Sequence, residues 1–137
     1  MLRVESRLRA RALQVLYVLE VSGDIGVDSA LAGVARLTRQ RPLMTDDVAE
    51  LVDGILEQRA TIDRLAQEAA QNWRLDRIAA VERNVLRIGI YELLTGRVPA
   101  KVAIDQAIWL AHRFGDVRAP AFINGVLDKV GHELGRL

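Results

Sequence analysis

Apolar residues recur at steps of three and four along almost the whole of this 137-residue chain. Side chains at this spacing line one face of an α-helix, whereas a half-buried β-strand needs strict alternation of apolar and polar residues. The sequence holds no alternating stretch of four to eight residues bounded by turn residues. The periodicity therefore predicts an all-α protein.

Turn residues and capping signals divide this pattern into a compact bundle of about seven helices. Thr45 is a good N-cap, with two aspartates behind it to complement the helix dipole, so a long helix is expected to start there and to run on to about Ala69. Gln58 is the one polar interruption in its apolar stripe. The other expected helices cover 5–21, 28–37, 79–94 and 99–114, and a last one starts near Pro120.

The pattern shifts around Trp73, within the polar run Gln71-Asn72-Trp73-Arg74. We place the boundary between two three-helix-like halves there, at about 1–72 and 73–137, within a single domain that spans 1–137. The segment 79–94 is apolar nearly all round, which predicts the central and most buried helix.

Composition excludes several classes of protein. The chain is 50% hydrophobic and 27% charged, as in one globular domain, and it has no cysteine for a disulfide, a thiolate metal site or a Cys nucleophile. The charged N-terminus is unlike a secretory signal, and no uncharged apolar run is long enough to cross a membrane. These features favour a cytosolic, that is cytoplasmic, protein.

The catalytic inventory is poor. There are three serines and two histidines, and no string that positions a phosphate, a metal or an acyl nucleophile. His112 and His132 lie on different expected helices and are interpreted as solvent-facing side chains. We therefore expect no enzyme, no catalytic residue, no metal and no cofactor.

The first eleven residues form a basic arm on a body of almost neutral charge. A helical wheel places Arg3, Arg7 and Arg11 on one side of the apolar stripe and Arg9 on the other, while Tyr17 projects outward. Guanidinium groups pair with phosphates and an exposed ring can stack on an unpaired base, so this combination suits single-stranded nucleic acid. A solvated charged face is the alternative that this feature leaves open.

Two further aromatic residues stand out. The wheel places Trp109 away from the stripe of its helix, where it lies over neighbouring side chains with a cation–π contact to Arg113, or marks a protein contact surface. Phe122 falls at the edge of the stripe of the last helix, just after the loop 115–119, and could simply be a residue at the edge of the core.

Four strings resemble the NusB family of bacterial transcription antitermination factors, in the right order and at the right separations. They are ARALQVLY at 10–17, VERNVLRIGIYELL at 81–94, VPAKVAIDQAIWLAHRFG at 98–115 and PAFINGVLDKV at 120–130. The resemblance spans nearly the whole chain and implies an all-helical fold of two small bundles.

The resemblance also implies a function without catalysis. NusB-like proteins bind the single-stranded boxA element of nascent ribosomal RNA together with the ribosomal protein NusE, in a complex with other Nus factors and RNA polymerase. By position, Arg7 and Arg9 match the RNA-binding arm, and Phe122 with the preceding loop matches a second RNA-contacting region. Arg118 in that loop stands where the family is often acidic and adds positive charge. Tyr17 and Glu82 match positions near the NusE-facing surface.

Two other functions remain open at this level. The chain could be a helical adaptor that binds proteins without RNA. It could also be a stand-alone recognition module of the kind found fused to ribosomal RNA methyltransferases, because it has no Gly-rich cofactor loop and no catalytic cysteine of its own.

Overall fold

A computed structural model describes residues 4–23, 25–39 and 42–137, with the side chains of residue 4 and of 42–44 left aside. Within these ranges every regular element is helical, with seven α-helices and one 3-10 helix. The expected all-α fold of about seven helices is confirmed. None of the described helices is both long and apolar enough to cross a membrane.

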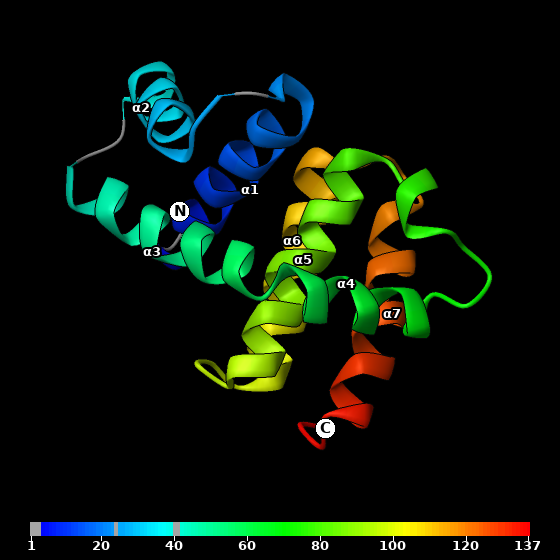
Figure 1. Cartoon of the computed structure of the whole chain (residues 1–137). Coiled ribbons are helices and arrows are strands. Elements are labelled where there is room, and N and C mark those ends of the chain that lie inside the picture. Colours follow the sequence, from blue (N-terminus) through cyan, green and yellow to red (C-terminus); the bar gives the residue numbers. More distant parts are fainter. Residues whose placement is uncertain (1–3, 24, 40–41) are drawn as a thin grey trace. The chain divides into compact units, whose positions relative to one another are not determined.

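The helices follow the expected order along the chain (Figure 1). They are α1 Val4–Ser22, α2 Val27–Thr38, α3 Pro42–Glu57, α4 Arg59–Ala69, the 3-10 helix η1 Leu75–Arg77, α5 Ala80–Thr95, α6 Ala100–Phe114 and α7 Ala119–Glu133. Four of these α-helices, α1, α2, α5 and α6, begin and end within a few residues of the predicted positions, and α7 begins within one residue of its predicted start.

The prediction of a single long helix from Thr45 to Ala69 is wrong. It is two helices, α3 and α4, separated at Gln58, whose φ of −104° and ψ of 14° are not those of a continuing helix. Ile55 and Ile62 lie on either side of the break and are both fully buried, so the apolar spacing runs on through it and gives no sign of it. The first of the two helices begins at Pro42 rather than after a cap at Thr45, in keeping with the preference of proline for a first helical turn.

The chain divides into two compact units, Met1–Glu57 and Gln58–Leu137. This division differs from the boundary expected near Trp73, because α4 packs against α5 and α7 of the second unit. In the first unit, α1 packs against both α2 and α3.

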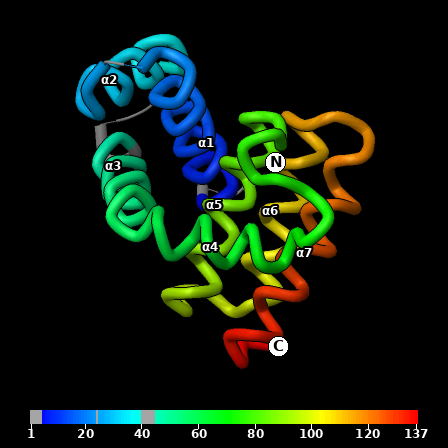
Figure 2. Tube along the Cα trace, turned by 45° about the vertical axis from the view of Figure 1, so that its right-hand side comes forward, coloured from blue at the N-terminus to red at the C-terminus, as the bar shows by residue number. Residues whose placement is uncertain are grey.

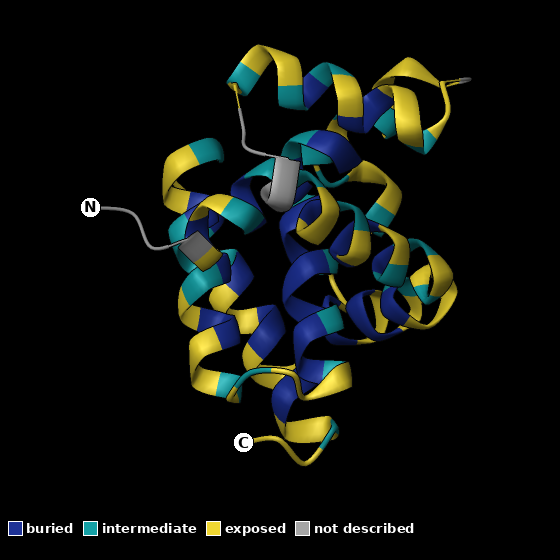
Figure 3. Cartoon of the chain, turned by 90° about the vertical axis from the view of Figure 1, so that its left-hand side faces the viewer, coloured by how far each residue is buried: buried dark blue, intermediate teal, exposed yellow. Residues whose placement is uncertain are grey.

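The second unit is built around α5, which contacts α4, α6 and α7 (Figure 2). Buried positions concentrate on the inward sides of the helices (Figure 3). Within residues 80–95 only Thr95 is exposed, so the helix expected to be central and most buried is confirmed as such. The helices around it also contribute fully buried residues to the core: Ile62, Leu110, Ile123 and Leu127.

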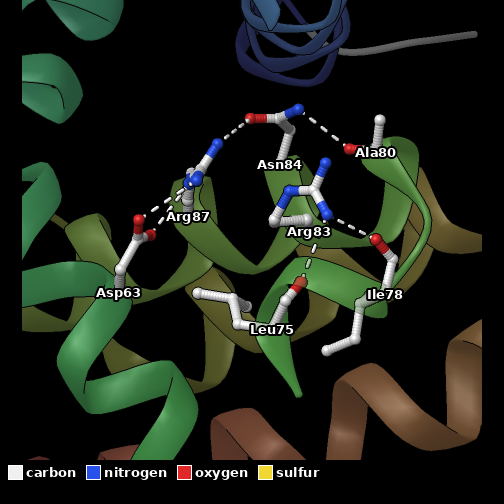
Figure 4. A network of polar contacts seen from close by, with 7 residues as sticks. All are labelled: Asp63, Leu75, Ile78, Ala80, Arg83, Asn84 and Arg87. Carbon is white, nitrogen blue, oxygen red and sulfur yellow. Dashed lines mark hydrogen bonds and ion pairs between the residues drawn. The ribbon is translucent and has the colours of Figure 1, made fainter. Parts of the chain in front are cut away.

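A polar network ties α4 to α5 (Figure 4). Arg87 Nε and Nη2 donate to the two carboxylate oxygens of Asp63 at 2.9 and 3.1 Å. Arg87 Nη1 also donates to Asn84 Oδ1 at 3.0 Å, and the Asn84 amide donates to the Ala80 carbonyl at 2.8 Å. Because both carboxylate oxygens and the fully buried Asn84 are satisfied, the network fixes the two helices in one register.

Candidate nucleic-acid interface

The α1 helix carries the first group of expected site residues. Arg7 is exposed and Tyr17 is 40% exposed, so both lie open to solvent as the wheel predicted. The predicted position of Arg3 lies outside the described residues. Arg11 is half-buried and donates to Gln14 Oε1 at 3.0 Å.

Arg9 differs from the expectation of an open arginine, since it is only 4% exposed and is engaged within the protein. The helix is buried over a wider arc than its apolar stripe, because Ser6, Arg9 and Leu13 form a second buried column at three- and four-residue spacing. A wheel based on hydrophobicity alone cannot find a column that begins with a serine and an arginine.

The second group of expected residues surrounds a hollow in the second unit, here called the first hollow. It has a volume of about 320 Å³ and lies among the loop before η1, the start of α5 and the start of α7. Its lining includes Trp73, Arg77, Glu82, Asp116, Arg118 and Phe122. Glu82, which is far from the other two in the chain, is thus brought beside Arg118 and Phe122, and all three were predicted from the sequence.

Phe122 is half-buried and forms one wall of this hollow. Its ring meets that of Trp73 edge to face, with centroids 5.9 Å apart and an angle of 73° between the planes. Arg118 and Arg77 at the rim are exposed. The hollow therefore combines aromatic surface with accessible guanidinium groups.

Glu82 belongs to the same hollow. It is half-buried, and its Oε1 accepts a hydrogen bond from the Asp116 N–H at 3.3 Å. This approach depends on Gly115, where an added Cβ would lie 2.9 Å from the same Glu82 oxygen and 2.7 Å from the Ala119 Cβ. The carboxylate of Glu82 thus holds the loop before α7 against α5.

Asp116 fixes the other end of this loop. Its Oδ1 accepts hydrogen bonds from the N–H groups of Arg118 at 2.8 Å and Ala119 at 3.1 Å. A carboxylate here satisfies amides of the first turn and complements the helix dipole. With its backbone held in this way, Arg118 is presented to solvent at the mouth of the hollow.

Trp73 is the functional candidate that sequence reasoning missed, since its segment served there only to mark a boundary. The side chain is 60% exposed, yet Gln67 holds the backbone that follows it. The Gln67 amide donates to the Trp73 carbonyl at 2.7 Å, and Gln67 Oε1 accepts from the Leu75 N–H at 2.8 Å. The available signal was a large aromatic residue within a short polar run.

Arg83 on α5 holds the rest of this loop (Figure 4). Its Nη1 donates to the carbonyls of Leu75 at 3.2 Å and Ile78 at 2.5 Å, at either end of η1. An exposed aromatic ring is therefore carried on a backbone that is fixed from two directions.

Trp109 makes the contact expected of it. The Arg113 guanidinium lies 5.9 Å from the centroid of the half-buried Trp109 ring, and 5.7 Å from that of Phe114. His112 and His132 are exposed, as predicted. The part of the chain that the structure describes contains no group of three or more His, Cys, Asp or Glu side chains that could hold a metal ion.

Comparison with known proteins decides the family. The model of the NusB family matches residues 6–132. The chain belongs to the NusB family. A transcription antitermination protein NusB from Anaeromyxobacter sp. (strain Fw109-5) is 46% identical over 127 residues, which cover 91% of this chain and 87% of the relative. The NusB of Sorangium cellulosum (strain So ce56) is 41% identical over 133 residues, covering 94% and 92%.

Solved structures share the fold. The structure of T. maritima NusB superimposes with a TM-score of 0.86 at 32% identity, over 97% of this chain and 94% of the other. A structure of the antitermination factors NusB and NusE in complex with double-stranded RNA gives a TM-score of 0.85 at 24% identity, over 97% and 99%. The arrangement of helices in this chain is therefore the NusB fold.

Proposed function

We propose that this NusB-family chain is a transcription antitermination factor that binds single-stranded boxA-type RNA of nascent ribosomal RNA together with the ribosomal protein NusE. The complex would also include other Nus factors and RNA polymerase, so the protein would act in the cytoplasm. Relatives that bear the name transcription antitermination protein, and a related structure described as NusB and NusE with RNA, support this assignment. The role requires binding only, with no catalytic residue and no cofactor.

The observation that carries the proposal is the hollow in the second unit, where Phe122 and Trp73 meet beside the exposed Arg118. Aromatic faces stack on unpaired bases of any sequence, and arginines neutralise the phosphates that link them. Phe122 would supply the stacking surface and Arg118 the phosphate contact.

The α1 helix supplies the second part of the proposed RNA surface. Arg7 is exposed and suited to a phosphate contact. Arg9 is buried, so we assign it a supporting role within the arm rather than a direct contact of the kind proposed for Arg7.

Tyr17 and Glu82 are proposed to serve the NusE-facing surface. The 40% exposure of Tyr17 is compatible with a ring that a protein partner covers. Glu82 is half-buried and bonded to the loop at Asp116, so it would act by holding that loop in shape as well as through its charge.

A gel-shift titration with boxA RNA, with and without NusE, tests the function. Phe122→Ala should weaken RNA binding by about 1–3 kcal/mol, because one stacking surface is lost. Phe114→Ala is the matched control, since Phe114 is also half-buried but lies outside the hollow.

The proposal fails if the wild-type protein binds boxA RNA no more tightly than an unrelated RNA, with or without NusE. Binding of NusE without any RNA affinity would instead favour the adaptor. If Phe122→Ala loses helicity by far-UV circular dichroism, Phe122 is a core residue rather than a stacking surface for RNA.

A further inference from the structure

A second hollow adjoins the first, and the two share Trp73 and Phe122 as lining residues. The second hollow has a volume of about 280 Å³ and lies between the end of α4 and the middle of α7. Its lining also includes Gln71, Asn72, Gly125 and Lys129. Both volumes are near the lower end of the range of about 300–1,000 Å³ for ligand pockets.

The aromatic pair therefore borders two spaces rather than one. Trp73 is 60% exposed on a backbone that Gln67 pins, so its ring is presented without being covered. A ring that is held at the surface buries little apolar area, so it contributes little to the stability of the fold. A ligand that covers the ring would recover this burial.

Gly125 gives an independent sign that something approaches α7 closely. It lies in the middle of that helix, where glycine is less favourable than alanine by about 1 kcal/mol. A Cβ built at Gly125 would meet no atom within 4 Å, so packing inside the described chain does not require a glycine. The missing side chain leaves the second hollow open at this position.

The charges around both hollows favour an anionic ligand. Arg77 and Arg118 border the first hollow and Lys129 the second, and all three side chains are exposed. Among the described residues, no carboxylate forms an ion pair with any of them. The two carboxylates of the first hollow, Glu82 and Asp116, instead accept hydrogen bonds from loop N–H groups.

We propose that the two hollows take two successive nucleotides of single-stranded RNA, one on each side of the Trp73–Phe122 pair. Trp73 stacks on a base, Arg77 and Arg118 contact the phosphate on one side, and Lys129 contacts it on the other. This inference rests on the proposed function and extends the RNA path from Phe122 across Trp73 to the middle of α7.

The first test removes the Trp73 ring. Trp73→Ala should bind boxA RNA about five- to a hundredfold more weakly, and Trp73→Phe should retain part of the affinity. Since Trp73 is mostly exposed, both variants should keep the unfolding midpoint of the wild type within a few degrees.

Fluorescence locates the contact. Trp109→Phe leaves Trp73 as the only tryptophan, and RNA should quench its emission if a base stacks on the ring. The converse variant, Trp73→Phe with Trp109 retained, should show little quenching.

The second test fills the second hollow. Gly125→Leu should fold as a helix and bind RNA at least fivefold more weakly, because the new side chain occupies the space of a nucleotide. Gly33→Leu in α2 is the matched control, since a Cβ there also meets nothing within 4 Å and Gly33 lines neither hollow.

The outcomes separate this inference from the function on which it rests. If the wild-type protein binds boxA RNA and both Trp73→Ala and Gly125→Leu bind it as tightly as the wild type, the two-nucleotide path is wrong and the function stands. If both variants lose affinity for NusE but bind RNA as tightly as the wild type, the surface belongs to a protein partner and the inference is again wrong. If wild-type protein shows no RNA affinity, the proposed function has failed first.

Discussion

The α1 and α5 helices carry arginines at the same four-residue spacing, Arg7 with Arg11 and Arg83 with Arg87. On α5 both arginines are bound within the second unit, Arg83 to two loop carbonyls and Arg87 to Asp63 and Asn84. On α1, Arg7 is exposed. Residue type and spacing are the same in the two helices. What differs is whether other segments place hydrogen-bond acceptors beside the arginine, and this decides whether it is structural or available to a ligand.

The physical basis of this difference is desolvation. The side chain of Arg87 is 12% exposed and that of Asp63 28%, so each charge depends on the other for compensation. An exposed arginine is hydrated whether or not a partner is present, and its loss costs the fold little. Substitution of Arg87 should therefore cost stability, whereas substitution of Arg7 should affect binding.

The largest effect is expected at Arg87. Arg87→Ala should reduce the free energy of unfolding by about 3 kcal/mol, because it leaves the Asp63 carboxylate partly buried without its bidentate partner. Urea denaturation followed by circular dichroism measures the loss. Asp63→Ala and the double variant complete a cycle, and the double variant should lose less than the sum of the single losses.

A loss below about 1 kcal/mol for Arg87→Ala would contradict the comparison, since Arg87 would then behave like an exposed arginine.

A smaller effect is expected at Gly96, where α5 ends with a φ of 65°. A Cβ there would lie 2.9 Å from Nη1 and Nη2 of Arg136, which donates to the Leu93 carbonyl at 3.0 Å and the Leu94 carbonyl at 3.3 Å. Gly96→Ala should cost about 2 kcal/mol in thermal or urea unfolding, through the positive φ and the displaced arginine.

Gly135→Ala is the matched control for this position. Gly135 has a φ of 69° and no atom within 4 Å of an added Cβ. The substitution should therefore cost only about 1 kcal/mol, from the strain of a positive φ in alanine. Equal losses at Gly96 and Gly135 would mean that Arg136 does not stabilise the end of α5.

The smallest effect on stability is expected at Arg7. Arg7→Ala should change the free energy of unfolding by less than about 0.5 kcal/mol and should lower the slope of log affinity for RNA against log salt by about 0.7, as one phosphate contact is lost. Arg9→Ala should instead lower the free energy of unfolding, because Arg9 is buried. A salt slope unchanged by Arg7→Ala in filter-binding titrations would remove this arginine from the RNA surface.

Most of the fold could be predicted from the sequence because helices are local. The caps and breaks around α5, α6 and α7 lie within one or two turns of the residues they affect, so periodicity and turn residues place these helices well. The break at Gln58 could not be predicted, since the buried positions before and after it keep a helical spacing. The division at Glu57 depends on which helices α4 packs against, and that is a non-local property.

The candidate site could be predicted in part. The exposure of Tyr17 and Arg7 follows from their place on a single helix, and the wheel finds both. The burial of Arg9 could not be found, because what covers a polar residue does not depend on its own hydrophobicity. The pairing of Trp73 with Phe122 joins a loop and a helix that are far apart in sequence, so neither residue alone indicates it.

The sequence by itself determined that the chain is helical, where most of its helices end, and which aromatic and basic residues stand apart from the apolar stripes, since these depend on interactions over three or four residues. Only the tertiary structure decided which arginines are bound within the protein and that Trp73, Phe122 and Gly125 border adjoining hollows. Burial, acceptor supply and cavity shape arise from segments that meet only when the chain has folded, and no local pattern encodes them.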